Sequence, residues 1–241
     1  MPGATPFLNG QRLWSLLQIS DQFFPTGGYA FSHALEMYVA EGVVHDRLSC
    51  YRLLTELCWQ AIGPCDLVFC VHAYRLALDV APEASTLAAL RELDRFVAAS
   101  KVPRELRQES RLTGQAFLRA AMTLAPPLLV QLLWQRVQEG LTPGHHALVF
   151  GVVAAALGIE ADSAWEAYLY TVMAGLVAAA LRLVPLGQSD GQRLLHDLGP
   201  LCFQVIQAYK DLPLDDVWSA TPGLEIRSMQ HERLYSRLCR S

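Results

Sequence analysis

The sequence predicts an all-α protein: a single domain of about nine or ten helices in a bundle-like arrangement, followed by a flexible C-terminal tail. Three observations lead to this class. Apolar residues recur every three or four positions through long segments, glycines and prolines separate those segments, and no segment alternates apolar with polar residues as a half-buried strand does. With 241 residues, 52% of them hydrophobic and 17% charged, the chain can bury a large core.

Helix-starting and helix-ending residues divide the chain into its expected elements. Ser32 is a candidate N-cap for the second helix, and Asp46 or Ser49 for the third. Thr142-Pro143 is interpreted as an N-cap followed by a proline in the first helical position. Gly63-Pro64 is expected to break the chain between two helices. The expected helices cover residues 11–20, 32–41, 46–62, 66–79, 83–100, 103–124, 128–139, 145–157, 162–184 and 190–210.

Three regions are expected along the chain: a flexible N-terminus at 1–10, a helical domain at 11–212 and a tail at 213–241. The tail contains two prolines, a glycine and few core-type residues. Such a segment is either a frayed, solvated terminus or a tail that folds onto a partner. The apolar residues that the tail could bury on a partner are Ile226, Met229, Leu234, Tyr235 and Leu238.

Composition limits the classes of partner. A formal net charge of −4 gives no case for nucleic-acid binding. The longest uncharged apolar run, residues 167–181, is shorter than the roughly 20 residues that span a bilayer. We interpret it as a buried helix and expect no membrane span. The excess of hydrophobic residues then indicates contacts between protein subunits.

Cysteine and histidine spacing gives no metal site. No secretory signal is evident, and no two of the six cysteines form a CxxC pair, so we expect reduced, mostly buried thiols in a cytoplasmic protein. Cys58 and Cys65 are interpreted as core thiols. His145 and His146 are adjacent, so on a helix their side chains would point about 100° apart and could not chelate one ion together. We interpret them as surface histidines, and we expect no cofactor.

Motifs of common enzymes are missing from the sequence. It contains no GxxxxGK[ST], GxGxxG, HExxH or GxSxG. The adjacent carboxylates Asp215 and Asp216 lie in the expected tail, where no apolar pocket would separate their pKa values. The chain is therefore interpreted as a binding protein and not as an enzyme.

The segment 16–42 contains the most distinctive pattern. Pro25, Gly27 and Gly28 predict a tight turn. Because exposed turns are usually polar, the aromatic residues around this one indicate either a buried turn between packed helices or a contact surface. These aromatic residues are Phe23, Phe24, Tyr29 and Phe31.

This segment resembles the N-terminal signature of the UreF family of urease accessory proteins, L-x-Q-x-x-D-x-x-F-P-x-G-G-[YF]-x-x-S-x-x-L-E. Ala34 departs from the family, which commonly has glycine there, and Cys239 replaces an aromatic residue of the family's C-terminal ending. Gly114 belongs to a later matching block and indicates either close helix packing or an interface. The matching residues are Leu16 or Leu17, Gln18, Asp21, Phe24, Pro25, Gly27, Gly28, Tyr29, Ser32, Leu35, Glu36, Arg107, Ser110, Gly114, His146, Gly151, Pro185, Gly187, Gln188 and Gly191.

The resemblance implies an all-α, non-catalytic scaffold for nickel insertion into urease. Proteins of this family dimerise, bind the accessory protein UreD (also called UreH) and recruit the GTPase UreG. The assembly docks on apo-urease, and the C-terminal tail becomes ordered on UreD. The candidate partner-binding residues are Phe24, Pro25, Gly27, Gly28, Tyr29, Ser32, Glu36, Arg107, Gln188, Arg227, His231, Arg233, Tyr235, Arg237 and Arg240.

Two alternatives remain open from the residues alone. The first is a helical enzyme in which Glu36, Arg107 and a histidine such as His33 act as acid–base groups, which requires them to converge on one pocket. The second is a peripheral membrane protein that uses the apolar excess.

Overall fold

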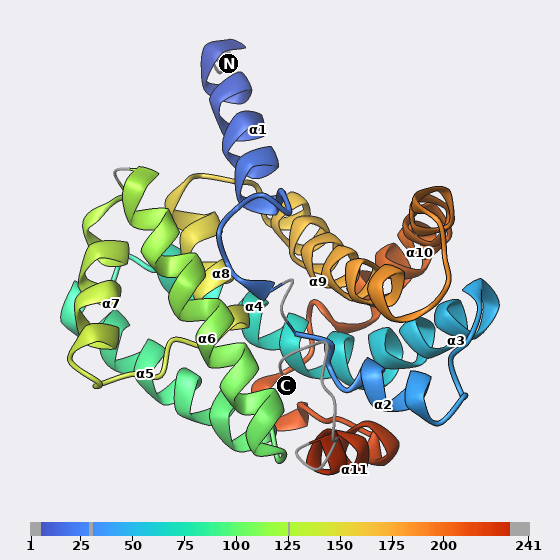
Figure 1. The fold of residues 1–241 in the computed structure, drawn as a ribbon. Helices are drawn as coiled ribbons and strands as arrows, with labels where there is room; N and C mark the ends of the chain where they lie inside the picture. The colour runs from blue at the N-terminus through green and yellow to red at the C-terminus, as the bar shows by residue number, and fades with distance from the viewer. Residues whose placement is uncertain (1–5, 29–30, 125, 232–241) are drawn as a thin grey trace.

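The structure, a computed structural model, describes residues 6–28, 31–124 and 126–231, which form helices joined by short connections (Figure 1). Within these ranges the chain contains no β-strand, so the predicted all-α class is confirmed. The α-helices are α1 (Pro6–Ser20), α2 (Leu35–Ala40), α3 (Arg47–Leu57), α4 (Val68–Leu78), α5 (Glu83–Ser100), α6 (Arg104–Ala121), α7 (Leu128–Gln138), α8 (His146–Ala156), α9 (Ala161–Leu183), α10 (Gln188–Tyr209) and α11 (Pro222–His231). The shorter helical segments are the π-helix η2 (Cys58–Leu67) and the 3₁₀ turns η3 (Met122–Leu124) and η4 (Leu214–Asp216).

Helix α8 lies at the centre of the fold. Its sequence is apolar on every side, and the residues from Ala147 to Ala155 are all buried, as expected for a helix surrounded by others. Helix α4 packs closely along it because Gly151 has no side chain: a Cβ atom there would lie 2.2 Å from the carbonyl oxygen of Cys70. The core is therefore organised around two backbones in direct contact.

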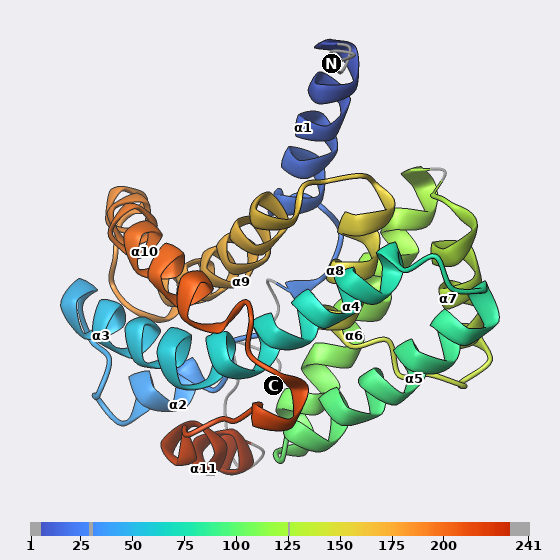
Figure 2. The ribbon, with the colours of Figure 1, turned by 180° about the vertical axis from the view of Figure 1, so that it is seen from behind.

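The other helices surround this pair. Figure 2 shows α5, α6 and α7 on one side of α4 and α8, with α3, α9 and α10 on the other side. Helix α1 projects away from the body and contacts it mainly through α9 (Figure 1). Helices α2 and α11 lie side by side at the opposite end of the molecule.

The predicted break at Gly63-Pro64 is wrong. Helices α3 and α4 are joined by η2 into one continuous helix, Arg47–Leu78. Pro64 has no N–H, so the carbonyl of Gln60 cannot accept its usual α-helical hydrogen bond. The wider π-helical turns accommodate the proline, and the carbonyl of Gln60 accepts a hydrogen bond from the N–H of Ala220 at 2.8 Å. A contact with a distant segment thus compensates for a local helix breaker.

The predicted start of the third helix is confirmed at Asp46, one of its two candidate N-caps. Asp46 caps α3, and the side chains of Asp46 and Ser49 form a reciprocal capping box. The predicted cap at Ser32 is wrong, because α2 begins at Leu35 after two residues in the left-handed conformation, His33 (φ 48°) and Ala34 (φ 59°). The left-handed φ at Ala34 is a physical reason for the glycine that is common there in the family it resembles.

Thr142 is also not the predicted N-cap, because α8 begins at His146 and His145 takes the N-cap position. The hydroxyl group of Thr142 donates instead to the buried carboxylate of Asp94 at 2.7 Å. A tertiary hydrogen bond has therefore replaced the local capping bond.

The C-terminal segment partly folds onto the helical domain. Helix α11 contacts α2 and α6 and buries Leu224 and Ser228, while Ile226 and Met229 face solvent. Residues 232–241 of the predicted tail lie outside the described part of the chain. At the other end, α1 begins at Pro6, within the region predicted to be a flexible N-terminus.

Two helical stretches, Arg47–Leu78 and Ala161–Leu183, have the length and composition of a membrane span. In each, 61% of the most apolar window is buried inside the fold. Core helices of globular proteins have the same property, so length and composition give only weak support for a span. The apolar run at 167–181 is part of α9 and packs against α10 and α8, as the prediction of a buried helix requires.

Candidate functional site

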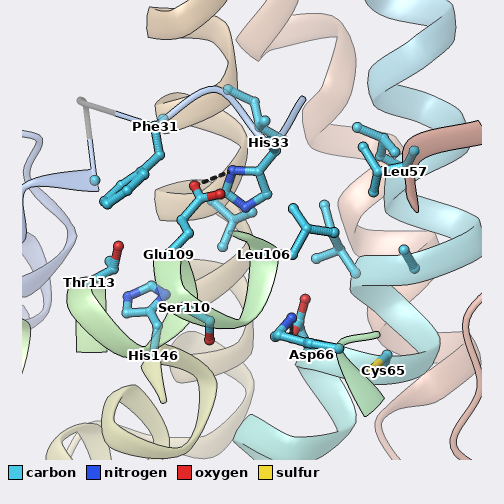
Figure 3. A pocket seen from close by; sticks show the side chains of 18 of the residues that line it. Phe31, His33, Leu57, Cys65, Asp66, Leu106, Glu109, Ser110, Thr113 and His146 are labelled. Carbon is cyan, nitrogen blue, oxygen red and sulfur yellow. Dashed lines mark hydrogen bonds and ion pairs between the residues drawn. The ribbon is translucent and has the colours of Figure 1, made fainter. Parts of the chain in front are cut away.

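A cavity of about 130 Å³ lies between the segment that precedes α2, the π-helix η2, and helices α6, α9 and α11 (Figure 3). Its walls combine apolar side chains with several ionisable ones. The ionisable and polar residues that line it include Asp21, His33, Cys65, Asp66, Lys101, Glu109, Ser110, Thr113, His146, Tyr168, Thr171 and Glu225.

Two ion pairs dominate the polar part of the cavity. His33 Nδ1 lies 2.7 Å from Glu109 Oε1, and Lys101 Nζ lies 2.6 Å from Asp66 Oδ1. Burial lowers the pKa of His33, but the Glu109 carboxylate outweighs burial and raises the pKa above its ordinary value. Burial lowers the pKa of Lys101, but the Asp66 carboxylate outweighs burial and raises the pKa above its ordinary value. Both cations are therefore held by partners within the wall.

The adjacent histidines are not surface residues, so that prediction is wrong. His145 is buried, and the ring of His146 lies against Phe117, Phe150 and Tyr168, with centroid distances of 5.6 to 6.0 Å. Burial lowers the pKa of each histidine to about 4, so both are neutral at pH 7. His146 Nε2 is buried without a hydrogen-bond partner among the described residues.

A buried carboxylate holds the start of α8 in place. Asp94, on α5, accepts hydrogen bonds from Thr142 Oγ1 at 2.7 Å, from the N–H of Gly144 at 2.6 Å and from the N–H of His145 at 3.0 Å. Three donors thus satisfy a carboxylate that has no contact with solvent. The bonds fix the turn that places His146 in the cavity wall.

Gly114 brings α6 onto the same turn. A Cβ atom at this position would lie 2.2 Å from the carbonyl oxygen of Gly144 and 2.6 Å from the nitrogen of His146. The sequence left close packing and an interface role open for Gly114, and the structure shows close packing.

The predicted turn residues divide between the core and the surface. Phe24 is buried against Phe117 at a centroid distance of 5.0 Å, so it supports the fold and is not exposed for a partner. Ser32 and Glu36 are also buried. Pro25 is exposed, Gly27 has φ of 68°, and Gly28 lines the cavity, whereas Tyr29 lies outside the described residues.

The remaining predicted contact residues are spread over the molecule. Arg107 donates to the carbonyl oxygen of Lys101 at 2.8 Å, and Gln188 is exposed at the start of α10. Arg227 pairs with Glu41 at 2.6 Å and lies over the ring of Tyr38 at 4.2 Å. His231 ends α11. The predicted tail residues Arg233, Tyr235, Arg237 and Arg240 lie outside the described part of the chain.

The acid–base set considered from the sequence is not assembled. His33 lines the cavity and pairs with Glu109, while Glu36 and Arg107 are not among the described residues that line it. Within the described ranges no group of three or more histidine, cysteine or acidic side chains is arranged to hold a metal ion. The described part of the cavity therefore contains two internal ion pairs, His33–Glu109 and Lys101–Asp66.

Sequence patterns missed most of the cavity's polar residues. Asp66 lies in the π-helix η2, Lys101 just after α5 and Glu109 in α6, and only the tertiary packing brings these three side chains to one cavity. The sequence did contain one signal for the buried carboxylate beside the cavity. Asp94 directly follows Leu93 and lies three residues before Val97, on the otherwise apolar face of its helix. A charged side chain is buried in such a position only when hydrogen bonds or an ion pair satisfy it.

Known proteins are similar in sequence to this chain along nearly its whole length. The family model UreF matches residues 44–199. The chain is 35% identical over 228 residues to a urease accessory protein UreF from Bacillus sp. (strain TB-90), covering 94% of this chain and 98% of that protein. Proteins of the same name are 34% identical over 240 residues in Bradyrhizobium sp. (97% and 94% covered) and 33% identical over 240 residues in Synechocystis sp. (97% and 100% covered).

Proposed function

Because this chain belongs to the UreF family of urease accessory proteins, we propose that it is a non-catalytic scaffold for nickel insertion into urease. In this role it forms a homodimer in the cytoplasm, binds UreD/UreH and the GTPase UreG, and docks with them on apo-urease. Nickel is the cargo of the assembly and not a resident cofactor of this chain. The observation that carries the proposal is the similarity to urease accessory proteins along nearly the whole chain.

The outer face of α1 supports a contact with a second copy. Leu13, Trp14 and Leu17 are more than half exposed on this projecting helix, while Ile19 is buried at its base. Leu17 lies four residues after Leu13 and three after Trp14, so all three side chains share one apolar face. An exposed apolar face of this kind is typical of a subunit interface.

The outer face of α11 supports a contact with UreD. Ile226 and Met229 are exposed there, three residues apart, at the end of the chain that the family resemblance assigns to this partner. The candidate contact residues Arg233, Tyr235, Arg237 and Arg240 follow α11 in the sequence, outside the described residues, and belong to the same proposed contact.

Replacing Leu17 by arginine should convert the dimer into a monomer, because a charge would enter an apolar interface. Size-exclusion chromatography with light scattering measures the molar mass of the chain alone and so distinguishes dimer from monomer. The same measurement detects the complex that the chain forms with UreD and UreG. Leu48→Arg on α3 is the matched control, since Leu48 and Leu17 have similar exposed fractions, 54% and 58%. If the Leu17→Arg variant is still a dimer, α1 is not the dimer interface. If UreD and UreG elute separately from the wild-type chain, the proposed scaffold role is contradicted.

A further inference from the structure

We propose that Cys58 and Cys202 form a redox-sensitive pair, which hydrogen peroxide converts from two free thiols into one intramolecular disulfide. The proposal concerns the chain alone and does not depend on the scaffold role. Cys58 lies in the π-helix η2 and Cys202 in α10, which packs against η2 and α3 (Figure 2). Both thiols are free in the structure, and the thiol of Cys58 is hydrogen-bonded to the sulfur of Cys202. The two sulfur atoms are therefore in contact across the interface between these helices.

The packing of η2 against α10 holds the two thiols together. Gly63 lets the helices approach closely, because a Cβ atom there would lie 2.8 Å from Tyr209 Cδ2. Tyr209 Oη donates to the carbonyl oxygen of Trp59 at 3.2 Å, and the two rings make an edge contact with centroids 5.9 Å apart. Trp59 directly follows Cys58, so this contact fixes the backbone beside the thiol. A disulfide is about 2.0 Å long, and small side-chain rotations bring contacting sulfur atoms to that length.

The two thiols differ in burial, and this difference assigns them different roles. Cys58 is fully buried, whereas Cys202 is partly exposed on α10. The hydrogen bond from Cys58 lowers the pKa of Cys202, and the same bond together with burial raises the pKa of Cys58. The thiolate, and not the thiol, attacks a peroxide. Cys202 is therefore the thiol that reacts first, and Cys58 is the thiol that resolves the product.

The oxidation proceeds in two steps with hydrogen peroxide as the oxidant. In the first step the Cys202 thiolate bonds to one peroxide oxygen, the O–O bond breaks and hydroxide leaves, which gives a sulfenic acid. In the second step the Cys58 sulfur attacks the sulfenic sulfur, the S–OH bond breaks, and the hydroxyl group leaves with the Cys58 proton as water. The hydroxide of the first step takes the proton that Cys202 had released. Two thiols and one peroxide thus give one disulfide and two molecules of water.

Three other described cysteines provide an internal comparison. Burial raises the pKa of Cys50 and Cys65 to about 11, and it also raises the pKa of Cys70. These buried thiols carry little thiolate at neutral pH, so we expect peroxide to leave them reduced. Selective oxidation is therefore expected at the η2–α10 interface.

The disulfide would tie α10 covalently to the helix that forms part of the cavity wall. Helix η2 carries Cys65 and Asp66, which line the cavity, so the bond would restrict movement of that wall. In a reducing compartment the thiol pool reverses such bonds, which restricts them to periods of oxidation. The pair would then act as a reversible switch.

Mass spectrometry of the oxidised wild-type chain tests the pair directly. The folded protein is treated with hydrogen peroxide, the remaining thiols are blocked with N-ethylmaleimide in urea, and the protein is digested without reductant. We expect one linked peptide pair that contains Cys58 and Cys202, is two hydrogen atoms lighter than the two free peptides together, and separates on reduction with dithiothreitol. Cys50, Cys65 and Cys70 should carry N-ethylmaleimide as they do in the untreated protein.

Two variants test the separate roles of the thiols. In Cys58→Ala the resolving thiol is missing, so the sulfenic acid on Cys202 should accumulate and be trapped by dimedone. In Cys202→Ser the thiol that reacts first is missing, so Cys58 should stay reduced. The wild-type result needs no substitution and decides the matter even if Cys58→Ala does not fold.

The outcomes separate the proposed pair from general oxidation. The Cys58–Cys202 link in the wild type, with a dimedone adduct on Cys202 in Cys58→Ala, supports the proposal. Absence of the link overturns it, as does a link from Cys202 to Cys239, which lies outside the described residues. Equal oxidation of Cys70, which is fully buried on α4, also overturns it, because unfolding would then have exposed the thiols.

Discussion

Replacing Gly114 by alanine should destabilise the protein by about 2–3 kcal/mol, because the new methyl group has no space and its neighbours cannot yield. The atoms it would meet are backbone atoms of Gly144 and His146, at 2.2 and 2.6 Å. That backbone is itself held by three hydrogen bonds to the buried Asp94. Helix α6 must therefore move off α8, although alanine is the better helix former by about 1 kcal/mol.

Gly175 is the matched control for this substitution, since it also lies inside a helix. No atom lies within 4 Å of a Cβ placed there, so Gly175→Ala should stabilise the protein by roughly 0.5–1 kcal/mol. Urea unfolding followed by circular dichroism measures both changes. Equal stability of Gly114→Ala and the wild type would show that α6 and the start of α8 are not in backbone contact.

Acid should destabilise the fold steeply between pH 6.5 and 5, by roughly 2 kcal/mol per pH unit. Burial lowers the pKa of His145 and His146 to about 4, whereas the unfolded chain binds protons near the ordinary value of 6.5. In this window the unfolded state binds more protons than the native state, so stability falls as the pH falls. His33 acts in a different window: its raised pKa gives stability that is complete below 6.5 and is lost as the pH rises through the folded value.

His146→Phe separates the histidine effect from the carboxylates. Phenylalanine fits beside Phe117, Phe150 and Tyr168 and does not titrate. The slope of unfolding free energy against pH between 6.5 and 5 should decrease by about 1 kcal/mol per unit, close to the effect of one proton. Urea titrations at several pH values give the slope for each protein. An unchanged slope would mean that His146 is already protonated in the native state.

The elements that the sequence predicted well are those with local causes. The apolar periodicity of residues 83–100 and the N-cap at Asp46, one of the two candidates, depend on neighbours along the chain, and the structure has both. Gly63-Pro64 did not end the helix, because the wider π-helical turns of η2 accommodate the proline and the distant N–H of Ala220 bonds to the carbonyl of Gln60. No local rule contains that information.

Local sequence rules also failed for the residues around the cavity. His145 and His146 looked like solvent-exposed side chains because the sequence does not show that Gly114 and Asp94 hold their turn inside the fold. The distinctive turn was located by its Pro and Gly residues, but Phe24 turned inward onto Phe117. Local chemistry predicted where the chain bends, and tertiary packing decided which side of the bend became surface.

The nickel content of urease tests the proposed role most directly. Urease subunits would be expressed with UreD, UreG and one of three forms: the full chain, no chain, or a chain that ends at His231. We expect purified urease to contain nickel with the full chain, and little without it or with the shortened form, because the scaffold or its tail contact with UreD is then missing. Equal nickel content with and without this chain would contradict the scaffold role.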